Sequence, residues 1–456
     1  MSLMKSISGI RGTIGGIPGD NLTPVDIVKF TAAYASILGK GKKVIVGRDG
    51  RMSGEMVSSL VVNTLLAMGL NVIDLGLSTT PTVEIAVVFE GAAGGIILTA
   101  SHNPKQWNAL KLLNEKGEFI SAELGLQMLS IAENEAFDFA GIDELGTYSY
   151  DDTLLQTHID AILVHPLVDK KAIASKNFKV VVDAINSSGA VAVPALLNAI
   201  GVTAITVLNA EMHGNFAHNP EPLAENLIEL CKEVTNQKAD LGIAVDPDVD
   251  RLCFVSEDGT LFGEEYTLVA VADYVLMHKK GNTVSNLSST RALKDVTEKF
   301  GGQYFASAVG EVNVVTKMKE VNAVIGGEGN GGIIDPQLHY GRDALIGIAL
   351  FLTHLAKSGL TVAELRKTYP AYYMSKNKID LPNHTDVKAL LQKVKDQYAS
   401  HPVNTEDGVK IEFDKSWVHL RASNTEPIIR VYSEASTVEK AKEIAQEVME
   451  QIKNLQ

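Results

Sequence analysis

The chain has 456 residues, of which 45% are hydrophobic and 21% are charged, and its net charge is −14. This composition is typical of a globular protein. A chain of this length is too long for one compact core, so we expect two to four domains. It contains no dense run of Lys and Arg, which argues against nucleic acid and anionic membrane surfaces as partners.

The N-terminus and the cysteines indicate the compartment. The first residues, MSLMKSISGIRG, contain no apolar leader, and the longest apolar runs are shorter than a membrane span. The two cysteines, Cys231 and Cys253, lack the spacing of a zinc site or of a disulfide framework. We therefore expect a cytoplasmic protein.

One pattern occurs three times along the chain. A β-branched run ends in a polar loop, a helical stretch follows, and a glycine precedes a second apolar run. This order is typical of βαβ units with largely parallel strands, so it predicts three related α/β domains. The glycines Gly69, Gly201 and Gly301 are expected to cap the three helices. The segments are residues 42–76, 178–209 and 282–310.

The first loop that could carry chemistry follows a predicted strand over Ile96–Leu98. Ser101 in this loop could act as a nucleophile or phosphate carrier, and His102 could orient it. Lys111, a few residues further on, could donate or accept a proton. When this loop is considered alone, a plain turn is the favoured interpretation, because Ser, Asn and Pro are turn formers.

The second loop contains three alternating aspartates, Asp246, Asp248 and Asp250, directly after an apolar strand. Alternate residues can direct their carboxylates into one space, and hard oxygen ligands of this kind suit Mg²⁺. The alternative is a solvated acidic turn, but the apolar runs on both sides argue against it.

The third loop is rich in glycine, so its backbone could approach a ligand closely. Glu328 and Asn330 are its only side chains with hydrogen-bonding groups, and they suit the hydroxyls or the amide of a sugar. A flexible glycine-rich turn is the alternative.

From about residue 370 the sequence predicts a separate α+β domain. A hairpin is expected to turn near Asp414-Lys415, and residues 426–435 read as a further strand. A helix with a capping box from Ser436 to Glu439 should follow. Its apolar face would comprise Ala441, Ile444, Ala445, Val448, Ile452 and Leu455.

A fourth loop lies between these last two strands. Its arginines match phosphate oxygens in geometry, and its hydroxyl and amide groups add donors. A surface loop with an ion pair to Glu426 is the alternative. The candidate anion ligands are Arg421, Ser423, Asn424, Thr425 and Arg430.

Three further arginines could place positive charge near a phosphate. These are Arg11 near the N-terminus, and Arg48 and Arg51 in the loop after the first predicted strand of the first repeat. For Arg48 we expect a structural ion pair, for instance with Asp49 or with an acid of the loop that contains the three aspartates.

The four loops together resemble a known family. TASHNP (99–104), DPDVDR (246–251), GGE (326–328) and RASNTEP (421–427) occur in this order in the α-D-phosphohexomutases. The resemblance covers the whole chain and implies a heart-shaped, four-domain α/β enzyme with mixed sheets in its first three domains. The implied domains are 1–145 with the phosphoserine loop, 146–253 with the metal loop, 254–369 with the sugar loop, and 370–456 with the phosphate loop.

The resemblance also implies roles for single residues. Ser101 would be the phosphoserine, and Asp246, Asp248 and Asp250 would bind Mg²⁺ together with its phosphate. Glu328 and Asn330 would hold the sugar hydroxyls. The implied catalytic partners of Ser101 are Arg11, His102, Lys111 and Arg251, and the residues implied to bind the unreactive phosphate are Arg421, Ser423, Asn424, Thr425 and Arg430.

The implied reaction is an isomerisation that moves a phosphoryl group between O6 and O1 of a hexose phosphate, with a hexose 1,6-bisphosphate as intermediate and activator. GEGNGG, with Asn330, resembles the phosphoglucosamine mutase branch, so we expect glucosamine 6-phosphate as substrate. A broad phosphoglucomutase/phosphomannomutase is the alternative, and a metal-dependent sugar phosphatase or a silent sugar-phosphate-binding protein are more remote. The partner is a small phosphosugar, and the chain is expected to be a monomer or a homodimer.

The chain departs from the usual family pattern at three positions. Pro247 replaces a glycine of the metal loop, which should stiffen the loop without removing a ligand. Ala109 replaces a glycine between the serine loop and Lys111. Asn330 replaces the usual serine of the sugar loop, and this last change underlies the expected preference for glucosamine phosphate.

Overall fold

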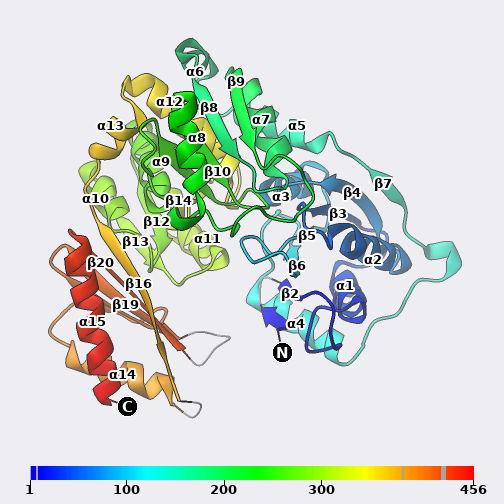
Figure 1. Ribbon diagram of the computed structural model, residues 1–456. Helices are drawn as coiled ribbons and strands as arrows, with labels where there is room; N and C mark the ends of the chain where they lie inside the picture. Colours follow the sequence, from blue (N-terminus) through cyan, green and yellow to red (C-terminus); the bar gives the residue numbers. More distant parts are fainter. Residues whose placement is uncertain (1, 7–8, 383–384, 423–427, 456) are drawn as a thin grey trace. The chain divides into compact units, whose positions relative to one another are not determined.

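The computed structural model describes residues 2–6, 9–382, 385–422 and 428–455 (Figure 1). The chain forms two compact units. Unit 1 comprises Met1–Thr267 and Asn330–Leu365, and unit 2 comprises Leu268–Gly329 and Arg366–Gln456. Within the described residues, no helix is long and apolar enough to cross a membrane.

Unit 1 begins with a mixed seven-stranded sheet of order β1-β2-β6-β5-β3-β4-β7. Strands β5, β3, β4 and β7 are parallel, whereas β1, β2 and β6 pair antiparallel. The strands are β1 (Met4–Ser6), β2 (Gly9–Thr13), β3 (Lys43–Arg48), β4 (Asn71–Leu77), β5 (Gly94–Leu98), β6 (Trp107–Leu113) and β7 (Tyr148–Tyr150), and the helices are α1 (Pro24–Leu38), α2 (Gly54–Ala67), α3 (Thr80–Phe89), α4 (Ala122–Glu133) and the short η1 (Ile142–Glu144).

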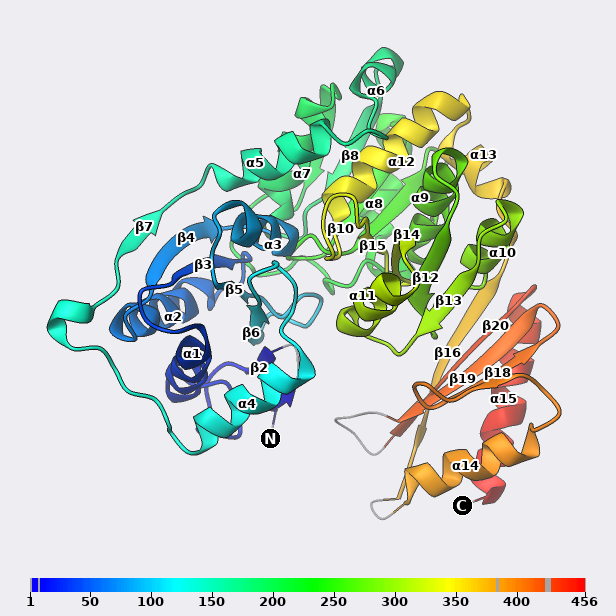
Figure 2. The same cartoon turned by 180° about the vertical axis from the view of Figure 1, so that it is seen from behind.

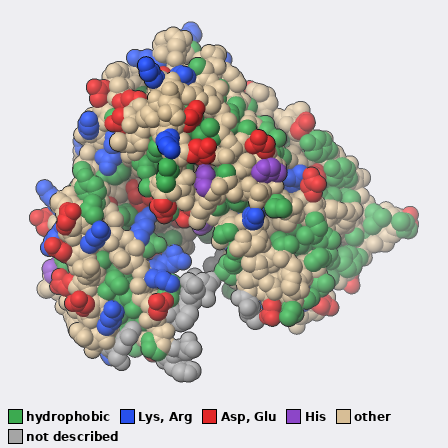
Figure 3. All heavy atoms as spheres, viewed as in Figure 1, with side chains coloured by type: hydrophobic (Ala, Val, Ile, Leu, Met, Phe, Trp, Pro, Cys, Tyr) green, Lys and Arg blue, Asp and Glu red, His purple; other side chains and the backbone are tan. Residues whose placement is uncertain are grey.

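Both faces of this sheet are buried, as the alternating side chains of β3 show. Val44 and Val46 pack with α1, α2 and α4, whereas Ile45 packs with Val83 and Val87 of α3 on the other face. The segment between α4 and β7 instead exposes apolar side chains, namely those of Phe139, Ile142 and Leu145. Figure 3 shows exposed apolar side chains over this part of unit 1.

The second sheet of unit 1 has the order β11-β10-β8-β9, with β11 antiparallel and the others parallel. Its strands are β8 (Lys179–Asp183), β9 (Ala204–Leu208), β10 (Leu241–Val245) and β11 (Leu252–Ser256). The remaining elements of unit 1 are α5 (Leu154–Leu163), α6 (Lys170–Lys176), α7 (Gly189–Ala199), η2 (Ala224–Asn226), α8 (Ile228–Gln237), β15 (Gly332–Ile334) and α12 (Ala344–Ser358). Two of the three unit boundaries fall inside α9 (Glu264–His278) and α13 (Val362–Lys367), and the third lies between Gly329 and Asn330.

Unit 2 contains parallel strands in the order β13-β12-β14 and a separate antiparallel sheet in the order β16-β20-β19-β18-β17. Figure 2 shows α14 and α15 on one face of the antiparallel sheet, where their apolar side chains form one core with its strands. The elements are β12 (Asn282–Asn286), α10 (Ala292–Lys299), β13 (Tyr304–Ser307), α11 (Glu311–Glu320), β14 (Ala323–Glu328), β16 (Tyr373–Asp380), α14 (Val387–Gln397), β17 (Val403–Asn404), β18 (Val409–Phe413), β19 (Ser416–Ala422), β20 (Ile428–Ala435) and α15 (Val438–Leu455).

The predicted fold class, three α/β domains followed by an α+β domain, is confirmed. The repeats are β3-α2-β4, β8-α7-β9 and β12-α10-β13. The predicted glycine caps are displaced by one position, because the helices are capped by Met68, Ile200 and Phe300. Each glycine is the next residue, with φ of 77° to 95°, a left-handed conformation that glycine adopts without steric cost.

The C-terminal hairpin is confirmed, with Phe413 paired to Ser416 across the turn. The predicted capping box from Ser436 to Glu439 is wrong by one residue. Helix α15 begins at Val438, and Thr437 caps it by accepting a hydrogen bond from the Lys440 amide on Oγ1 (3.2 Å). The predicted apolar face is buried at Ala441, Ile444, Ala445, Val448 and Ile452, while the side chain of Leu455 lies outside the described residues.

Candidate active site

Ser101 lies in the loop that connects β5 to β6 and is only 3% exposed. Its φ of 49° is left-handed, which is uncommon for a residue with a side chain. Its amide donates to Thr99 Oγ1 (2.9 Å), and its hydroxyl donates to Asp246 Oδ2 (2.6 Å). The loop therefore directs Ser101 Oγ at the first aspartate of the metal loop.

The three aspartates follow β10 and are fully buried. Each offers an oxygen that lies within 4.8 Å of those of the others. Among the described residues, Asp248 Oδ1 and Asp250 Oδ1 have no hydrogen-bond partner. Unpartnered carboxylate oxygens are costly to bury, so this donor set fits a divalent cation with oxygen ligands, such as Mg²⁺.

Basic side chains surround the aspartates. Lys111 Nζ lies 2.6 Å from Asp248 Oδ2 and 3.2 Å from Asp250 Oδ2. Arg342 Nη2, from the segment before α12, lies 2.7 Å from the same oxygen of Asp250. Thr80, at the start of α3, donates its hydroxyl to Asp248 Oδ2 (2.6 Å). Cations thus neutralise much of the negative charge of this cluster.

These contacts shift the pKa values in opposite directions. Burial raises the pKa of Asp246 well above its usual range, and the charges of Asp248 and Asp250 raise it further. Burial also acts to raise the pKa of Asp250, but Arg342 and Lys111 outweigh it and lower that pKa. Desolvation opposes the charge on Lys111, yet the aspartates outweigh it and raise its pKa, so Lys111 is an ammonium ion.

The structure also brings Arg11, His102 and Arg251 to this site. Arg11 Nη1 donates to Asn103 Oδ1 in the serine loop (2.8 Å). His102 Nδ1 lies 3.5 Å from Ser101 Oγ. Burial lowers the pKa of His102 well below its usual range, and the charges of Arg251 and Arg11 lower it further, so its ring is neutral.

Arg251 contacts both the metal loop and a more distant acid. Its Nη1 donates to Glu221 Oε1 at 2.9 Å, and its Nε lies 4.0 Å from Asp246 Oδ2. The predicted catalytic residues therefore converge within unit 1, although they are scattered from residue 11 to residue 251.

The sugar loop spans the boundary between the units. Glu328 in unit 2 accepts hydrogen bonds on Oε1 from Asn286 Nδ2 (2.8 Å) and the Gly310 amide (3.1 Å). Asn330 in unit 1 is half-buried, and its Oδ1 accepts from the Gly332 amide (3.1 Å). Asn330 Nδ2 donates no hydrogen bond to another of the described residues, so this donor could serve a ligand.

The predicted phosphate loop is described in part. Arg421 on β19 lies directly opposite Arg430 on β20, and Arg421 Nε lies 3.1 Å from Asp407 Oδ2. Like charges in opposite positions repel each other, and a bound anion would relieve the repulsion. The other three predicted ligands, Ser423, Asn424 and Thr425, lie outside the described residues, as does the alternative partner Glu426.

Sequence reasoning missed Thr80, Glu221, Arg342 and Asp407. Thr80 and Arg342 lie far along the chain from their partners: Thr80 is 168 residues from Asp248, and Arg342 is 92 residues from Asp250. None of the four belongs to one of the recognised motifs, and a single charged or hydroxyl residue outside a motif gives no signal of its own.

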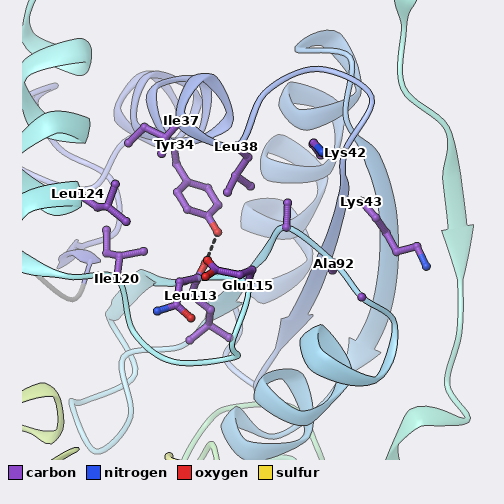
Figure 4. Close-up of a pocket in the computed structure, with 13 residues that line it drawn as sticks. Tyr34, Ile37, Leu38, Lys42, Lys43, Ala92, Leu113, Glu115, Ile120 and Leu124 are labelled. Atoms are coloured by element: carbon purple, nitrogen blue, oxygen red, sulfur yellow. Dashed lines mark hydrogen bonds between the residues drawn. The ribbon is translucent and has the colours of Figure 1, made fainter. Parts of the chain in front are cut away.

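A cavity of about 430 Å³ lies elsewhere in unit 1 (Figure 4). Tyr34 of α1 points into it and donates its hydroxyl to the Leu113 carbonyl (2.5 Å). Ile37, Ile120 and Leu124 contribute apolar walls. None of the predicted site residues that the structure describes lines this cavity.

Comparison with known proteins shows four successive matches to family models. They are described as phosphoglucomutase/phosphomannomutase alpha/beta/alpha domain I (residues 4–138), domain II (156–259), domain III (263–373) and C-terminal domain (377–451).

Similar proteins cover nearly the whole chain. A phosphoglucomutase/phosphomannomutase of Thermococcus kodakarensis is 37% identical over 442 residues, which cover 95% of this chain and 96% of the relative. A phosphoglucosamine/phosphogalactosamine mutase of Sulfurisphaera tokodaii is 34% identical over 452 residues, which cover 98% of both. A crystal structure of a phosphoglucomutase/phosphomannomutase family protein from Burkholderia thailandensis matches with a TM-score of 0.85 at 25% identity, over 98% of this chain and 96% of that one.

Proposed function

Because the chain belongs to the phosphoglucomutase/phosphomannomutase family, we propose that it moves a phosphoryl group between O6 and O1 of a hexose phosphate through Ser101. The observation that carries this proposal is the 2.6 Å hydrogen bond from Ser101 Oγ to Asp246, within a buried carboxylate cluster that fits a cation. A phosphate carrier requires this proximity, since a cation must offset the charge of the phosphate.

The proposed reaction consists of two transfers. In the first, the Oγ–P bond of phosphorylated Ser101 breaks, an O–P bond forms on the free hydroxyl of the substrate, and the proton of that hydroxyl passes to Ser101 Oγ. In the second, the other sugar O–P bond of the hexose 1,6-bisphosphate breaks, an Oγ–P bond forms on Ser101, and the proton of Ser101 passes to the released sugar oxygen. No water is consumed, so the product is an isomer of the substrate.

The residues around Ser101 have distinct proposed roles. Arg11, Arg251 and Lys111 supply fixed positive charge where negative charge develops during transfer. His102, neutral and beside Ser101 Oγ, can accept a proton from a hydroxyl. Asp246, Asp248 and Asp250 would hold a divalent cation, which when bound offsets the charge of the phosphorylated serine.

Substrate positioning is assigned to the remaining loops. Glu328 and Asn330 would hold the sugar, and Arg421 and Arg430 would hold the phosphate that does not react, together with Ser423, Asn424 and Thr425. We retain the division into domains 1–145, 146–253, 254–369 and 370–456 as part of this proposal, since it gives one of these loops to each domain.

For the sugar we propose glucosamine 6-phosphate, converted to glucosamine 1-phosphate. Asn330 supports this preference, because its amide offers a donor and an acceptor to the substituent on C2. The similarity to the Sulfurisphaera phosphoglucosamine/phosphogalactosamine mutase supports it as well. The Thermococcus relative, a phosphoglucomutase/phosphomannomutase, favours broad hexose specificity as the second candidate.

A panel assay tests the proposal. The purified protein with Mg²⁺ and a hexose 1,6-bisphosphate activator is incubated with the 6-phosphates of glucosamine, glucose, mannose and N-acetylglucosamine, and both 1-phosphate and free phosphate are measured. We expect isomerisation without free phosphate, fastest with glucosamine 6-phosphate. Stoichiometric phosphate release would instead identify a phosphatase, and sugar-phosphate binding without turnover would identify a silent binding protein.

A further inference from the structure

Arg51 follows β3, and its side chain is one of the largest fully buried side chains in the described residues, 1% exposed. An arginine side chain has five N–H donors in a fixed fork, and all five are used here. Nε donates to a carboxylate, and the two Nη atoms donate to four backbone carbonyls of the serine loop. The acceptors are Asp49 Oδ2 (3.0 Å) and the carbonyl oxygens of Ser101 (2.5 Å), Asn103 (2.7 Å), Pro104 (2.9 Å) and Trp107 (2.8 Å).

Because all five N–H donors of Arg51 are used, this side chain cannot also bind a phosphate. The sequence allowed both Arg48 and Arg51 to supply positive charge to a phosphate, but Arg51 has no donor left for one. Arg48 points elsewhere and pairs with the exposed Glu55 (3.3 Å). The expected ion pair of Asp49 is therefore made by Arg51 rather than by Arg48. Arg51 acts on the backbone of the serine loop.

The peptide groups on both sides of Ser101 are fixed by this arrangement. The Ser101 carbonyl accepts from Arg51, and the Ser101 amide donates to Thr99 Oγ1. Thr99 in turn donates its hydroxyl to Asp49 Oδ2 (2.6 Å), the same oxygen that binds Arg51 Nε. A left-handed conformation is strained for a residue other than glycine and persists only where its surroundings hold it. Asp49, Arg51 and Thr99 keep Ser101 in this conformation through the hydrogen bonds given above.

The same short loop is also connected to the metal loop. The amide of Gly50 donates to Ser187 Oγ (2.9 Å), and Ser187 donates to the carbonyl of Pro247 (2.6 Å). Ser188 donates to that carbonyl as well (2.8 Å). Residues 49–51 thus connect the serine loop with the loop that carries Asp246, within unit 1.

We infer that Arg51 is a positioning residue for Ser101: through its five hydrogen bonds, and supported by Asp49 and Thr99, it holds the serine loop so that Ser101 Oγ faces Asp246. The inference rests on the proposed function, in which Ser101 carries the phosphate. Phosphoryl transfer depends mainly on positioning, and a misplacement of about 1 Å can cost about 10²-fold in rate.

The substitution Arg51→Lys tests the inference, because lysine keeps the charge but offers three donors on a single nitrogen. We expect kcat to fall by roughly 10²-fold with KM within about twofold of wild type. Phosphorylation of Ser101 by a hexose 1,6-bisphosphate, followed by intact mass, should slow in parallel. Hydrogen exchange of the amides in residues 99–107 should accelerate while the other amides of unit 1 keep their protection. Arg48→Lys is the matched control and should behave as wild type.

A second pair of variants decides the matter if Arg51→Lys does not fold. Thr99→Val removes the hydroxyl that binds the Ser101 amide at nearly constant shape, whereas Thr99→Ser retains it. We expect Thr99→Val to reproduce the loss of kcat and the faster loop exchange, and Thr99→Ser to rescue both.

The outcomes distinguish failure of the inference about Arg51 from failure of the proposed function. A folded Arg51→Lys variant with wild-type kcat, serine phosphorylation and loop exchange overturns the inference, as does a Thr99→Val variant with wild-type values. Failure of the proposed function appears instead in the wild type, as an absence of mutase turnover and of phosphoserine. In that case loop exchange in the variants still decides whether Arg51 positions the loop.

Discussion

The hydroxyl of Ser101 donates a 2.6 Å hydrogen bond to Asp246, a residue 145 positions away along the chain. The contact joins the loop after β5 to the loop after β10, which belong to different sheets of unit 1. A carboxylate alone would repel a phosphate on this serine. The surrounding cations, Lys111 and Arg251, together with a divalent ion among the aspartates, would make phosphorylation tolerable.

Substituting Ser101 by alanine should abolish turnover without unfolding the protein, because in the proposed mechanism this hydroxyl carries the phosphate in both transfers. We expect kcat to fall by roughly 10⁴-fold or more. The mass increment of about 80 Da that a hexose 1,6-bisphosphate produces in the wild type should be absent from the variant. Ser59→Ala, on the exposed side of α2, is the control and should retain both. Substantial turnover by Ser101→Ala would refute the mechanism.

Substituting Lys111 by glutamine should strengthen Mg²⁺ binding while weakening catalysis. The ammonium lies 2.6 and 3.2 Å from oxygens of Asp248 and Asp250, so it repels a cation bound by these carboxylates. We expect Mg²⁺ affinity to rise roughly tenfold, or about 1.4 kcal/mol, in isothermal titration calorimetry. The exposed Lys116→Gln variant should bind Mg²⁺ as the wild type does. Weaker binding by Lys111→Gln would show that the lysine supports the metal site rather than competing with the cation.

Substituting Asn330 by serine should move the sugar preference from glucosamine phosphate toward glucose or mannose phosphate. Serine has a shorter side chain, and its single hydroxyl replaces the separate amide donor and carbonyl acceptor of asparagine. We expect the ratio of kcat/KM for glucosamine 6-phosphate to that for glucose 6-phosphate to fall about tenfold. Both substrates are measured with the same preparation, so the ratio is independent of the active fraction. An unchanged ratio would show that Asn330 does not determine the sugar preference.

His419 should make the protein less stable as the pH falls below 6.5. Burial lowers its pKa to about 4, although its ring contacts the Asp407 carbonyl (2.6 Å) and Ser288 Oγ (2.9 Å). The unfolded chain therefore binds the proton more readily, and the stabilisation present above pH 6.5 is lost as the pH falls toward 4. The loss amounts to about 3 kcal/mol in total.

This prediction is checked by urea unfolding at several pH values between 7 and 4.5. The free energy of unfolding of His419→Gln should fall less steeply with decreasing pH than that of the wild type. His401→Gln, at an exposed position, should retain the wild-type slope. Equal slopes for all three proteins would mean that His419 binds its proton equally well in the folded and unfolded chains.

Several features of the site followed from local sequence. Side chains two residues apart can point to the same side, and the three alternating aspartates after β10 indeed present their oxygens to one space. The repeated order of strand, loop, helix and strand likewise predicted the three α/β domains. Local patterns were less accurate at element ends. Thr437 caps α15 in place of Ser436. The sequence could not distinguish the two, because each has a hydroxyl that could accept the hydrogen bond.

The sequence by itself determined the fold class, the four motif loops and the family, since periodicity, turn residues and motif order are properties of neighbouring residues. Only the tertiary structure decided which charges meet. It paired Asp250 with Arg342 and Lys111, and it directed Arg51 onto the backbone of the serine loop. The physical reason is that a buried charge takes its partner from whichever loops the strand order brings to the same edge of a sheet, and this order depends on the packing of the whole unit.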